Sequence, residues 1–213
     1  MKIKVCGLKY QDNINAVADL APDYMGFICY DRSPRFIGQM ENDLFDELPN
    51  SIIKTAVFVN ENAEQVSKLI ALYKFSAIQL HGNESPDFCN RFKNKVTVIK
   101  AYGVDEDFDF GILERYKNNV DFFMFDTKTA EHGGSGRKFN WDILNKYELN
   151  VPFFLSGGLS PDNMEEVKKI DHPMFYAVDL NSRFETSPGI KDINKLTTAF
   201  NTIKKFNSDE VRS

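Results

Sequence analysis

Cys6 is the first residue in the chain whose type and position could support acid–base chemistry. It stands near the end of a short apolar run at residues 3–7, and Lys4, two residues earlier, would point to the same side of an extended strand. A neighbouring ammonium group favours the thiolate over the thiol, and the thiolate is the reactive form of cysteine. A lone cysteine on a strand is more often a small buried hydrophobe, so the residues alone leave both interpretations open.

Asp126 ends a strongly apolar run, residues 122–125 with the sequence FFMF. Apolar neighbours raise the pKa of a carboxyl group by desolvation, and a carboxyl that keeps its proton near neutral pH can act as a general acid. A hydrogen-bonded loop anchor explains the residue equally well. Asp179 and His81 also stand near the ends of apolar runs, and each is open to a catalytic or a structural interpretation.

Gly157 and Gly158 form a candidate phosphate site. They precede Ser160-Pro161, a capping serine followed by a proline at the first helical position. Backbone N–H groups at the start of a helix bind phosphate, although a tight turn between a strand and a helix needs the same glycines. A second glycine cluster, GGSGRK at 133–138, has no Gly-Lys-Ser/Thr ending and no GxGxxG frame, so we interpret it as a loop near the site.

Eight short apolar runs must position these residues. They recur along the chain with polar, helix-compatible stretches between them, at residues 3–7, 24–29, 53–59, 77–82, 96–102, 121–126, 151–157 and 175–180. Near-continuous apolar runs are typical of parallel strands that are covered on both faces. The pattern predicts an α/β fold, a single compact (βα)8 TIM barrel with short loops. An open doubly wound sheet is the alternative, although roughly five to six strands are more usual there.

The carboxyl ends of all strands in such a barrel meet on one face, where active sites lie. Cys6, His81, Asp126, Gly157 and the Asn181-Ser182 pair each end or follow a predicted strand. We therefore expect these residues to converge on that face.

The chain of 213 residues is long enough for one domain with a substantial core. No linker, low-complexity segment or sequence repeat divides it. We expect the barrel to occupy residues 1–206 and a polar tail to occupy residues 207–213.

Composition and spacing exclude several classes of function. A net charge of −5 argues against nucleic-acid binding, which needs a basic face. No apolar run approaches the roughly 18 residues that span a bilayer, and the N-terminal segment lacks the apolar core of a signal peptide. Cys6, Cys29 and Cys89 show no paired spacing, and no CxxC or HxxxH pattern indicates a metal site. We expect a cytoplasmic protein with reduced thiols that binds a small molecule, without metal, nucleic-acid or membrane partners.

Eight motifs, in order along nearly the whole chain, resemble those of the phosphoribosylanthranilate isomerase family. They are KVCGL at 4–8, GFICYDRSPRFI at 26–37, VFVN at 57–60, QLHGNES at 79–85, FDT at 125–127, GGSGRKFNW at 133–141, LSGGLSPDN at 155–163 and DLNSRFETSPGIKD at 179–192.

The resemblance implies a small (βα)8 barrel that needs no cofactor and no metal. It implies an isomerase that converts N-(5-phosphoribosyl)anthranilate to 1-(2-carboxyphenylamino)-1-deoxyribulose 5-phosphate by an Amadori rearrangement, the third step from chorismate in tryptophan biosynthesis. A monomer is expected, with a homodimer as the alternative.

The same resemblance implies roles for residues in the matching motifs. Cys6 would be the general base, Asp126 the general acid, and Arg35 would hold the anthranilate carboxylate. Asp179 and His81 would support substrate binding.

The resemblance also places the substrate phosphate against the backbone of Gly157-Gly158 and Asn181-Ser182. Two positions depart from the family pattern. Arg183 follows Ser182 where many family members have glycine, which puts the contact of a glycine amide with the phosphate in question, and the Arg183 side chain would either pair with the phosphate or point to solvent. Ser156 stands where alanine often precedes the glycines, a small change.

Two alternatives stay open on the sequence. An isomerase of histidine biosynthesis runs the same chemistry, but those barrels use a carboxylate where this chain has Cys6, and their substrate carries two phosphates. The loop at 133–136 is a weak candidate for a second phosphate site. A non-catalytic barrel that binds a phosphorylated metabolite would not need an acid–base pair such as Cys6 and Asp126.

Overall fold

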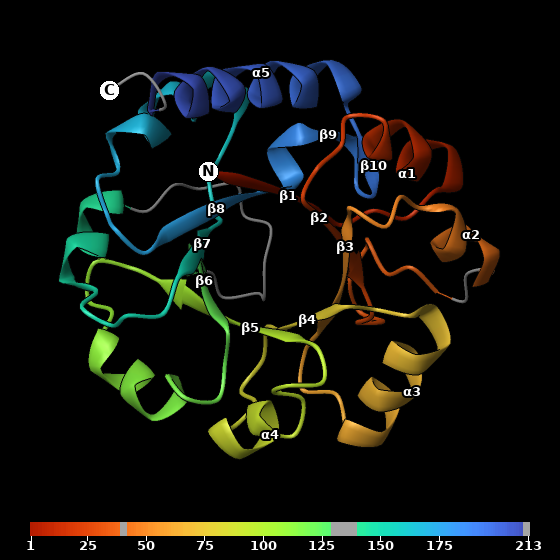
Figure 1. Cartoon of the computed structure of the whole chain (residues 1–213), viewed down its shortest axis with the longest axis horizontal. Helices are drawn as coiled ribbons and strands as arrows, with labels where there is room; N and C mark the ends of the chain where they lie inside the picture. Colours follow the sequence, from red (N-terminus) through yellow and green to blue (C-terminus); the bar gives the residue numbers. More distant parts are fainter. Residues whose placement is uncertain (39–41, 129–139, 211–213) are drawn as a thin grey trace.

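Eight parallel strands close into a barrel in the computed structural model, which describes residues 1–38, 42–128 and 140–210 (Figure 1). The strands follow one another in chain order, and the last pairs with the first. Their bounds are β1 (Lys2–Cys6), β2 (Tyr24–Ile28), β3 (Ile53–Phe58), β4 (Ala77–Leu80), β5 (Thr97–Val104), β6 (Phe122–Thr127), β7 (Phe153–Leu155) and β8 (Phe175–Leu180). The closed order confirms the predicted (βα)8 barrel and rules out the open sheet.

Helical segments surround the strands on the outside of the barrel (Figure 1). The α-helices are α1 (Gln11–Ala18), α2 (Asn42–Glu47), α3 (Ala63–Tyr73), α4 (Pro86–Asn90) and α5 (Ile193–Glu210). The 3₁₀ helices are η1 (Phe110–Tyr116), η2 (Trp141–Lys146), η3 (Pro161–Lys169) and η4 (Ser182–Phe184), and a short antiparallel pair follows, β9 (Glu185–Ser187) and β10 (Ile190–Lys191). Within the three described ranges, no helix combines the length and the apolar character needed to cross a membrane.

An apolar layer fills the barrel interior below the carboxyl ends of the strands. Its buried members are Tyr24, Ile99, Ala101, Met124, Phe154 and Ala177. Side chains alternate across a strand, so residues two positions after Met124, Phe154 and Ala177 face the same interior. These are Asp126, Ser156 and Asp179. The strands therefore place a polar layer directly above the apolar one.

Helix α5 crosses the boundary that we expected between residues 206 and 207. The amino group of Met1 donates to Asn207 Oδ1 at 2.7 Å, and Asn207 Nδ2 donates to the carbonyl oxygen of Met1 at 3.1 Å. These bonds tie the end of the helix to the start of β1. Residues 207–210 continue the helix, residues 211–213 lie outside the described part, and the extent of the barrel domain stays a prediction.

We expect Phe154→Ala to lower the free energy of unfolding by about 3–5 kcal/mol, because the ring is fully buried and its loss leaves a cavity in the interior layer. Urea unfolding of the two proteins measures the difference. Leu72→Ala, at a side chain that is 42% exposed, should change the free energy by less than about 0.5 kcal/mol. Equal effects of the two substitutions would contradict the position of Phe154 in the core.

Candidate active site

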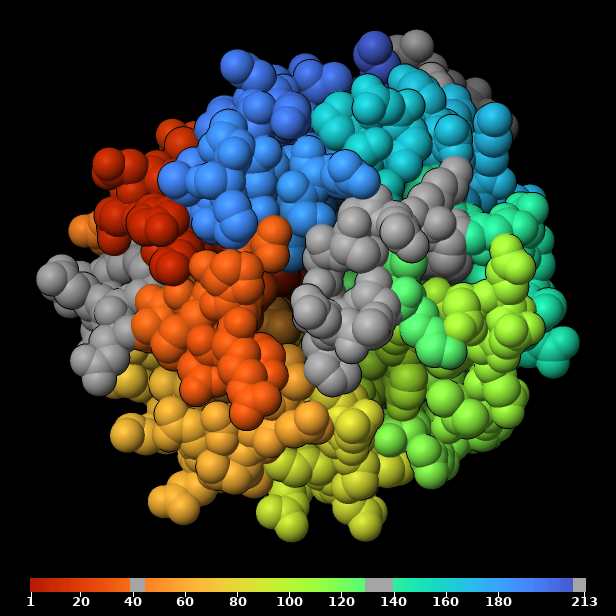
Figure 2. Space-filling model, turned by 180° about the vertical axis from the view of Figure 1, so that it is seen from behind, coloured from red at the N-terminus to blue at the C-terminus, as the bar shows by residue number. Residues whose placement is uncertain are grey.

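A cavity of about 680 Å³ opens at the carboxyl ends of the strands. The residues singled out from the sequence that line it are Cys6, Arg35, His81, Asp126, Ser156, Asp179 and Asn181. Figure 2 looks onto this face, where the segment after β2 (orange) lies beside the segment after β8 (blue). Gly157, Gly158 and Ser182 are not among the described residues that line the cavity, although they stand just after β7 and β8.

A buried ion pair stands at the base of the site. Lys4 Nζ lies 2.8 Å from Asp179 Oδ1, and the two side chains are 0% and 4% exposed. Ser156 Oγ donates to the second oxygen of Asp179 at 3.4 Å. Burial opposes the charged form of Lys4, but Asp179 and Cys6 together raise its pKa above the ordinary value. The ammonium group therefore keeps its charge beside the thiol.

Burial raises the pKa of the Cys6 thiol above its ordinary value of 9.0. Lys4 and Lys191 lower this pKa and Asp179 raises it, but burial is the largest cause. From the sequence we expected Lys4 to favour the thiolate. Lys4 does act on the sulfur in that direction, yet desolvation outweighs it and favours the thiol over the thiolate.

The absence of a side chain at Gly26 leaves space for the Cys6 sulfur. The two residues are partners in the register of β1 and β2. A Cβ atom at position 26 would lie 2.6 Å from Cys6 Sγ, closer than any real contact allows. The sequence alone assigns Gly26 no role, because the need for a glycine emerges only when the two strands are paired.

Asp126 has a pKa of about 6, raised from the ordinary 3.8 by burial. The backbone N–H of Thr127 donates to Asp126 Oδ1 at 2.7 Å and opposes this shift, while Asp179 reinforces it. Gly157, with φ of +77°, packs against the same carboxylate, and a Cβ atom there would lie 2.7 Å from Asp126 Oδ1. The backbone thus fixes the position of the carboxyl group, and burial brings its pKa close to neutral pH, as a general acid requires.

His81 faces Asp126 from the end of β4. Its Nε2 lies 3.7 Å from Asp126 Oδ2, and its Nδ1 lies 2.9 Å from Gln79 Nε2. An amide NH₂ group only donates, so this contact places the imidazole hydrogen on Nε2, toward Asp126. Gln79 is buried, and its Oε1 has no hydrogen-bond partner in the described part of the chain. The pair of side chains therefore sets the orientation of His81 within the cavity.

Two residues that the sequence analysis did not single out, Glu185 and Lys191, surround Arg35. Arg35 Nη2 donates to Glu185 Oε2 at 2.7 Å, and Lys191 Nζ donates to Glu185 Oε1 at 2.7 Å. Both residues stand in the motif at 179–192. Their opposite charges, in a segment that follows a predicted strand, are the feature of the sequence that could have identified them as site residues. Their pairing depends on the hairpin of β9 and β10, which the sequence analysis did not predict.

The glycines after β7 lead into a capped 3₁₀ helix. Gly157 and Gly158 have φ of +77° and +69°, and Ser160 with Asn163 forms a capping box at the start of η3. The expected helix start at Ser160-Pro161 is present, with 3₁₀ rather than α-helical geometry. Because β7 pairs with β8, the backbone N–H groups of this turn lie at the strand end next to Asn181.

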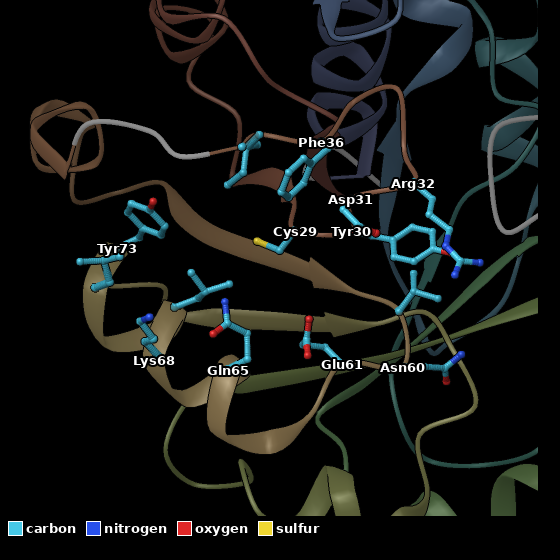
Figure 3. Close-up of a pocket in the computed structure, with 15 residues that line it drawn as sticks. Cys29, Tyr30, Asp31, Arg32, Phe36, Asn60, Glu61, Gln65, Lys68 and Tyr73 are labelled. Atoms are coloured by element: carbon cyan, nitrogen blue, oxygen red, sulfur yellow. The ribbon is translucent and has the colours of Figure 1, made fainter.

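A larger hollow, of about 930 Å³, lies between the segment after β2 and helix α3 (Figure 3). It shares Tyr30, Arg32 and Val59 with the cavity described above. Neither Cys6 nor Asp126 lines it. The smaller cavity is the candidate active site, because titratable side chains from several strand ends converge in it and burial raises the pKa of two of them, Cys6 and Asp126.

Across residues 1–38, 42–128 and 140–210, no cluster of three or more His, Cys, Asp or Glu side chains is arranged to hold a metal ion. Cys6, Cys29 and Cys89 are free thiols. The glycine cluster at 133–138, which we interpreted as a loop near the site, lies outside the described residues.

The sequence is similar to a family of isomerases. A sequence model described as N-(5'phosphoribosyl)anthranilate (PRA) isomerase matches residues 3–202. A protein of Parabacteroides distasonis named N-(5'-phosphoribosyl)anthranilate isomerase is 43% identical over 199 residues, which cover 92% of this chain and 90% of that protein.

Solved structures of proteins with the same name share the fold. Phosphoribosyl anthranilate isomerase from Thermotoga maritima superposes with a TM-score of 0.80 at 30% identity, covering 96% of this chain and 99% of that one. A phosphoribosyl anthranilate isomerase in complex with reduced 1-(o-carboxyphenylamino)-1-deoxyribulose 5-phosphate superposes with a TM-score of 0.77 at 26% identity, with the same coverage.

The raised pKa of Asp126 predicts a pH-dependent effect on stability. Between pH 3.8 and about 6, the folded protein holds a proton that the unfolded chain releases. The resulting stabilisation is complete below pH 3.8 and is lost as the pH rises through about 6, a change of about 3 kcal/mol. Asp126→Asn cannot ionise, so it should become more stable relative to wild type as the pH rises from about 4 to about 7.

Urea unfolding of both proteins across this pH range checks the prediction. A difference in free energy of unfolding that stays constant with pH would show that Asp126 titrates at its ordinary value.

Proposed function

The chain belongs to the N-(5'-phosphoribosyl)anthranilate isomerase family, and on that premise we propose which residues carry out its reaction. The enzyme converts N-(5'-phosphoribosyl)anthranilate to 1-(2-carboxyphenylamino)-1-deoxyribulose 5-phosphate, an Amadori rearrangement in tryptophan biosynthesis. Family membership decides against the two alternatives left open by the sequence, the isomerase of histidine biosynthesis and the non-catalytic barrel.

Cys6 is the general base and Asp126 is the general acid in this proposal. The observation that carries it is that both groups line one cavity, from β1 and β6, and that burial raises the pKa of each. Strands β7 and β8 lie between β6 and β1 in the barrel. A phosphate held at the ends of β7 and β8 would therefore have its sugar between the acid and the base.

Two anchors position the substrate. The backbone of Gly157-Gly158 and of Asn181-Ser182 binds the phosphate, through N–H groups at the start of η3 and after β8. Arg35 binds the anthranilate carboxylate, and the planar guanidinium group can donate two parallel hydrogen bonds to it. Asp179 and His81 support the site through their contacts with Lys4 and Asp126. Because both ends of the substrate are held, its reacting carbons stay in a fixed orientation relative to the acid and the base.

The reaction proceeds by one proton donation and one proton abstraction. Protonated Asp126 donates to the ribose ring oxygen as the bond from that oxygen to the first carbon breaks, which leaves an iminium ion. The Cys6 thiolate removes the proton from the second carbon, which the adjacent iminium has made acidic. The resulting enolamine tautomerises to the ketose, and one proton then moves from Cys6 back to Asp126.

The reactive pair contains a protonated Asp126 and an ionised Cys6. It holds the same number of protons as the opposite pair, ionised Asp126 with a Cys6 thiol. Because burial raises the pKa of Cys6 above its ordinary value and that of Asp126 only to about 6, the opposite pair is the more populated one in the free enzyme at neutral pH. Once Asp126 has donated its proton, the iminium cation stabilises the Cys6 thiolate that removes the proton from the second carbon.

A monomeric, cytoplasmic protein is part of the proposal, with a homodimer as the alternative. The large apolar side chains that are exposed in the described ranges are four, Tyr10, Leu72, Ile112 and Ile190. Three free thiols suit a reducing compartment.

Cys6→Ala and Asp126→Asn should each lower kcat by about 10²–10⁴-fold and leave KM within a few-fold of wild type, because each removes one proton transfer and no anchor. The decrease in anthranilate-type fluorescence of the substrate measures turnover. Cys89→Ala, which removes a buried thiol on α4 away from the cavity, is the matched control and should keep wild-type turnover. Near-normal kcat in either of the first two variants would remove that residue from its role.

A further inference from the structure

One edge of the Arg35 guanidinium group is fully occupied within the protein. Its Nε donates to Glu185 Oε1 at 2.9 Å and to Oε2 at 3.0 Å, and its Nη2 donates to Oε2 at 2.7 Å. A guanidinium group carries five N–H donors, and this fork uses Nε and one hydrogen of Nη2. The opposite edge, Nη1 with the second hydrogen of Nη2, has no hydrogen-bond partner among the described residues. Arg35 lines the active-site cavity, and its side chain is only 13% exposed.

Glu185 is itself held in place by a second cation. Lys191 Nζ, fully buried, donates to Glu185 Oε1 at 2.7 Å and to Asn181 Oδ1 at 2.8 Å, and the backbone N–H of Gly189 donates to Glu185 Oε1 at 3.2 Å. Burial raises the pKa of Glu185, but Arg35 and Lys191 together hold it below its ordinary value. The carboxylate is therefore ionised and fixed at both oxygens.

The cluster of Arg35, Glu185 and Lys191 carries one positive charge that no residue within it neutralises. Burying an unmatched charge is unfavourable, and burial lowers the pKa of Lys191 below its ordinary value for the same reason. A carboxylate arriving at the open edge of Arg35 would make the numbers of positive and negative charges equal. The cluster is thus complementary to an anionic group in the cavity.

The backbone beneath the cluster keeps Arg35 close to the phosphate side of the site. Gly7, with φ of +81°, lies under both side chains, and a Cβ atom there would lie 2.7 Å from Arg35 Cδ and 2.7 Å from Asn181 Oδ1. Figure 2 shows the consequence, because the segments after β2 and β8 meet beside the hollow.

We propose that Glu185, supported by Lys191, is a positioning residue that presents the Nη1–Nη2 edge of Arg35 to the anthranilate carboxylate. This inference rests on the proposed role of Arg35 in binding that carboxylate. Glu185 touches no reacting atom. It sets the angle of the fork that Arg35 presents to the cavity.

The test uses Glu185→Gln, Arg35→Ala and the double variant in the full chain. Glu185→Gln should raise KM for the substrate about tenfold or more and change kcat less than about threefold, since it weakens one charge-assisted anchor and leaves the acid and base intact. Arg35→Ala should raise KM at least as much. In the double variant KM should equal that of Arg35→Ala, because Glu185 acts only through Arg35.

Two inhibitors separate positioning from general damage. Inhibition by anthranilate, which has the carboxylate, should weaken in Glu185→Gln, while inhibition by ribose 5-phosphate, which lacks it, should stay the same. Asp46→Asn removes the same charge from an exposed ion pair with Lys74 and should change neither inhibition. Glu185→Asp keeps the charge and shortens the reach, so it should fold and show the same selective loss if Glu185→Gln does not fold.

Equal weakening of both inhibitors, or a further rise of KM when Glu185→Gln is added to Arg35→Ala, would overturn the inference and make Glu185 a structural residue. An unchanged KM in Arg35→Ala alone would instead overturn the proposed carboxylate anchor. The two results are distinguishable, because failure of the carboxylate anchor shows in Arg35→Ala alone, whereas failure of the Glu185 inference shows only in the Glu185 variants.

Discussion

The burial of charged groups at the carboxyl end of the barrel is the constraint on which the rest of the site depends. Lys4 and Asp179 form an ion pair there with almost no exposure, and Ser156 donates to the same carboxylate. Removing one member of such a pair typically costs about 3–5 kcal/mol, because the other charge is left buried and unpaired. The pair must therefore persist as a unit, and its opposite charges act on Cys6 in opposite directions. What remains is desolvation, which keeps the thiol protonated.

The alternation of side chains along the strands explains how acid and base come to share this environment. The apolar layer that contains Met124, Phe154 and Ala177 continues two residues later as Asp126, Ser156 and Asp179. The same apolar layer that stabilises the barrel lies beneath this carboxyl group, whose pKa is raised by burial. Packing and catalysis are thus linked, since a looser interior that admitted water would return the pKa of Asp126 toward 3.8.

Much of the fold follows from local patterns in the sequence, and much of the site does not. Eight apolar runs predicted eight strands correctly, because a parallel strand covered on both faces needs a continuous apolar segment. The 3₁₀ geometry of η3 and the end of α5 depend on packing against neighbours, which no local pattern specifies. The protonation of Cys6 also escaped prediction, because the sequence shows Lys4 nearby but does not show how completely the sulfur is buried.

The contacts between distant segments were the least predictable part. Arg35 and Glu185 are 150 residues apart, and their fork forms only when the barrel closes and brings the segments after β2 and β8 together. The role of Gly26 was unpredictable for the same reason, since the absence of a side chain there matters only because the residue lies opposite Cys6. Motifs marked both regions, but only the paired strands reveal what the motifs do.

The most direct test of this account is the ionisation of Cys6 in the free enzyme, followed by the ultraviolet absorbance of the thiolate during a pH titration. Cys6→Ser isolates the signal, because burial raises the pKa of Cys29 to about 12 and that of Cys89 to about 11. Cys6 should show no thiolate at neutral pH, and the midpoint of its titration should lie above 9.0. A midpoint at or below neutral pH would contradict it, and would mean that Lys4 rather than burial determines the state of the base.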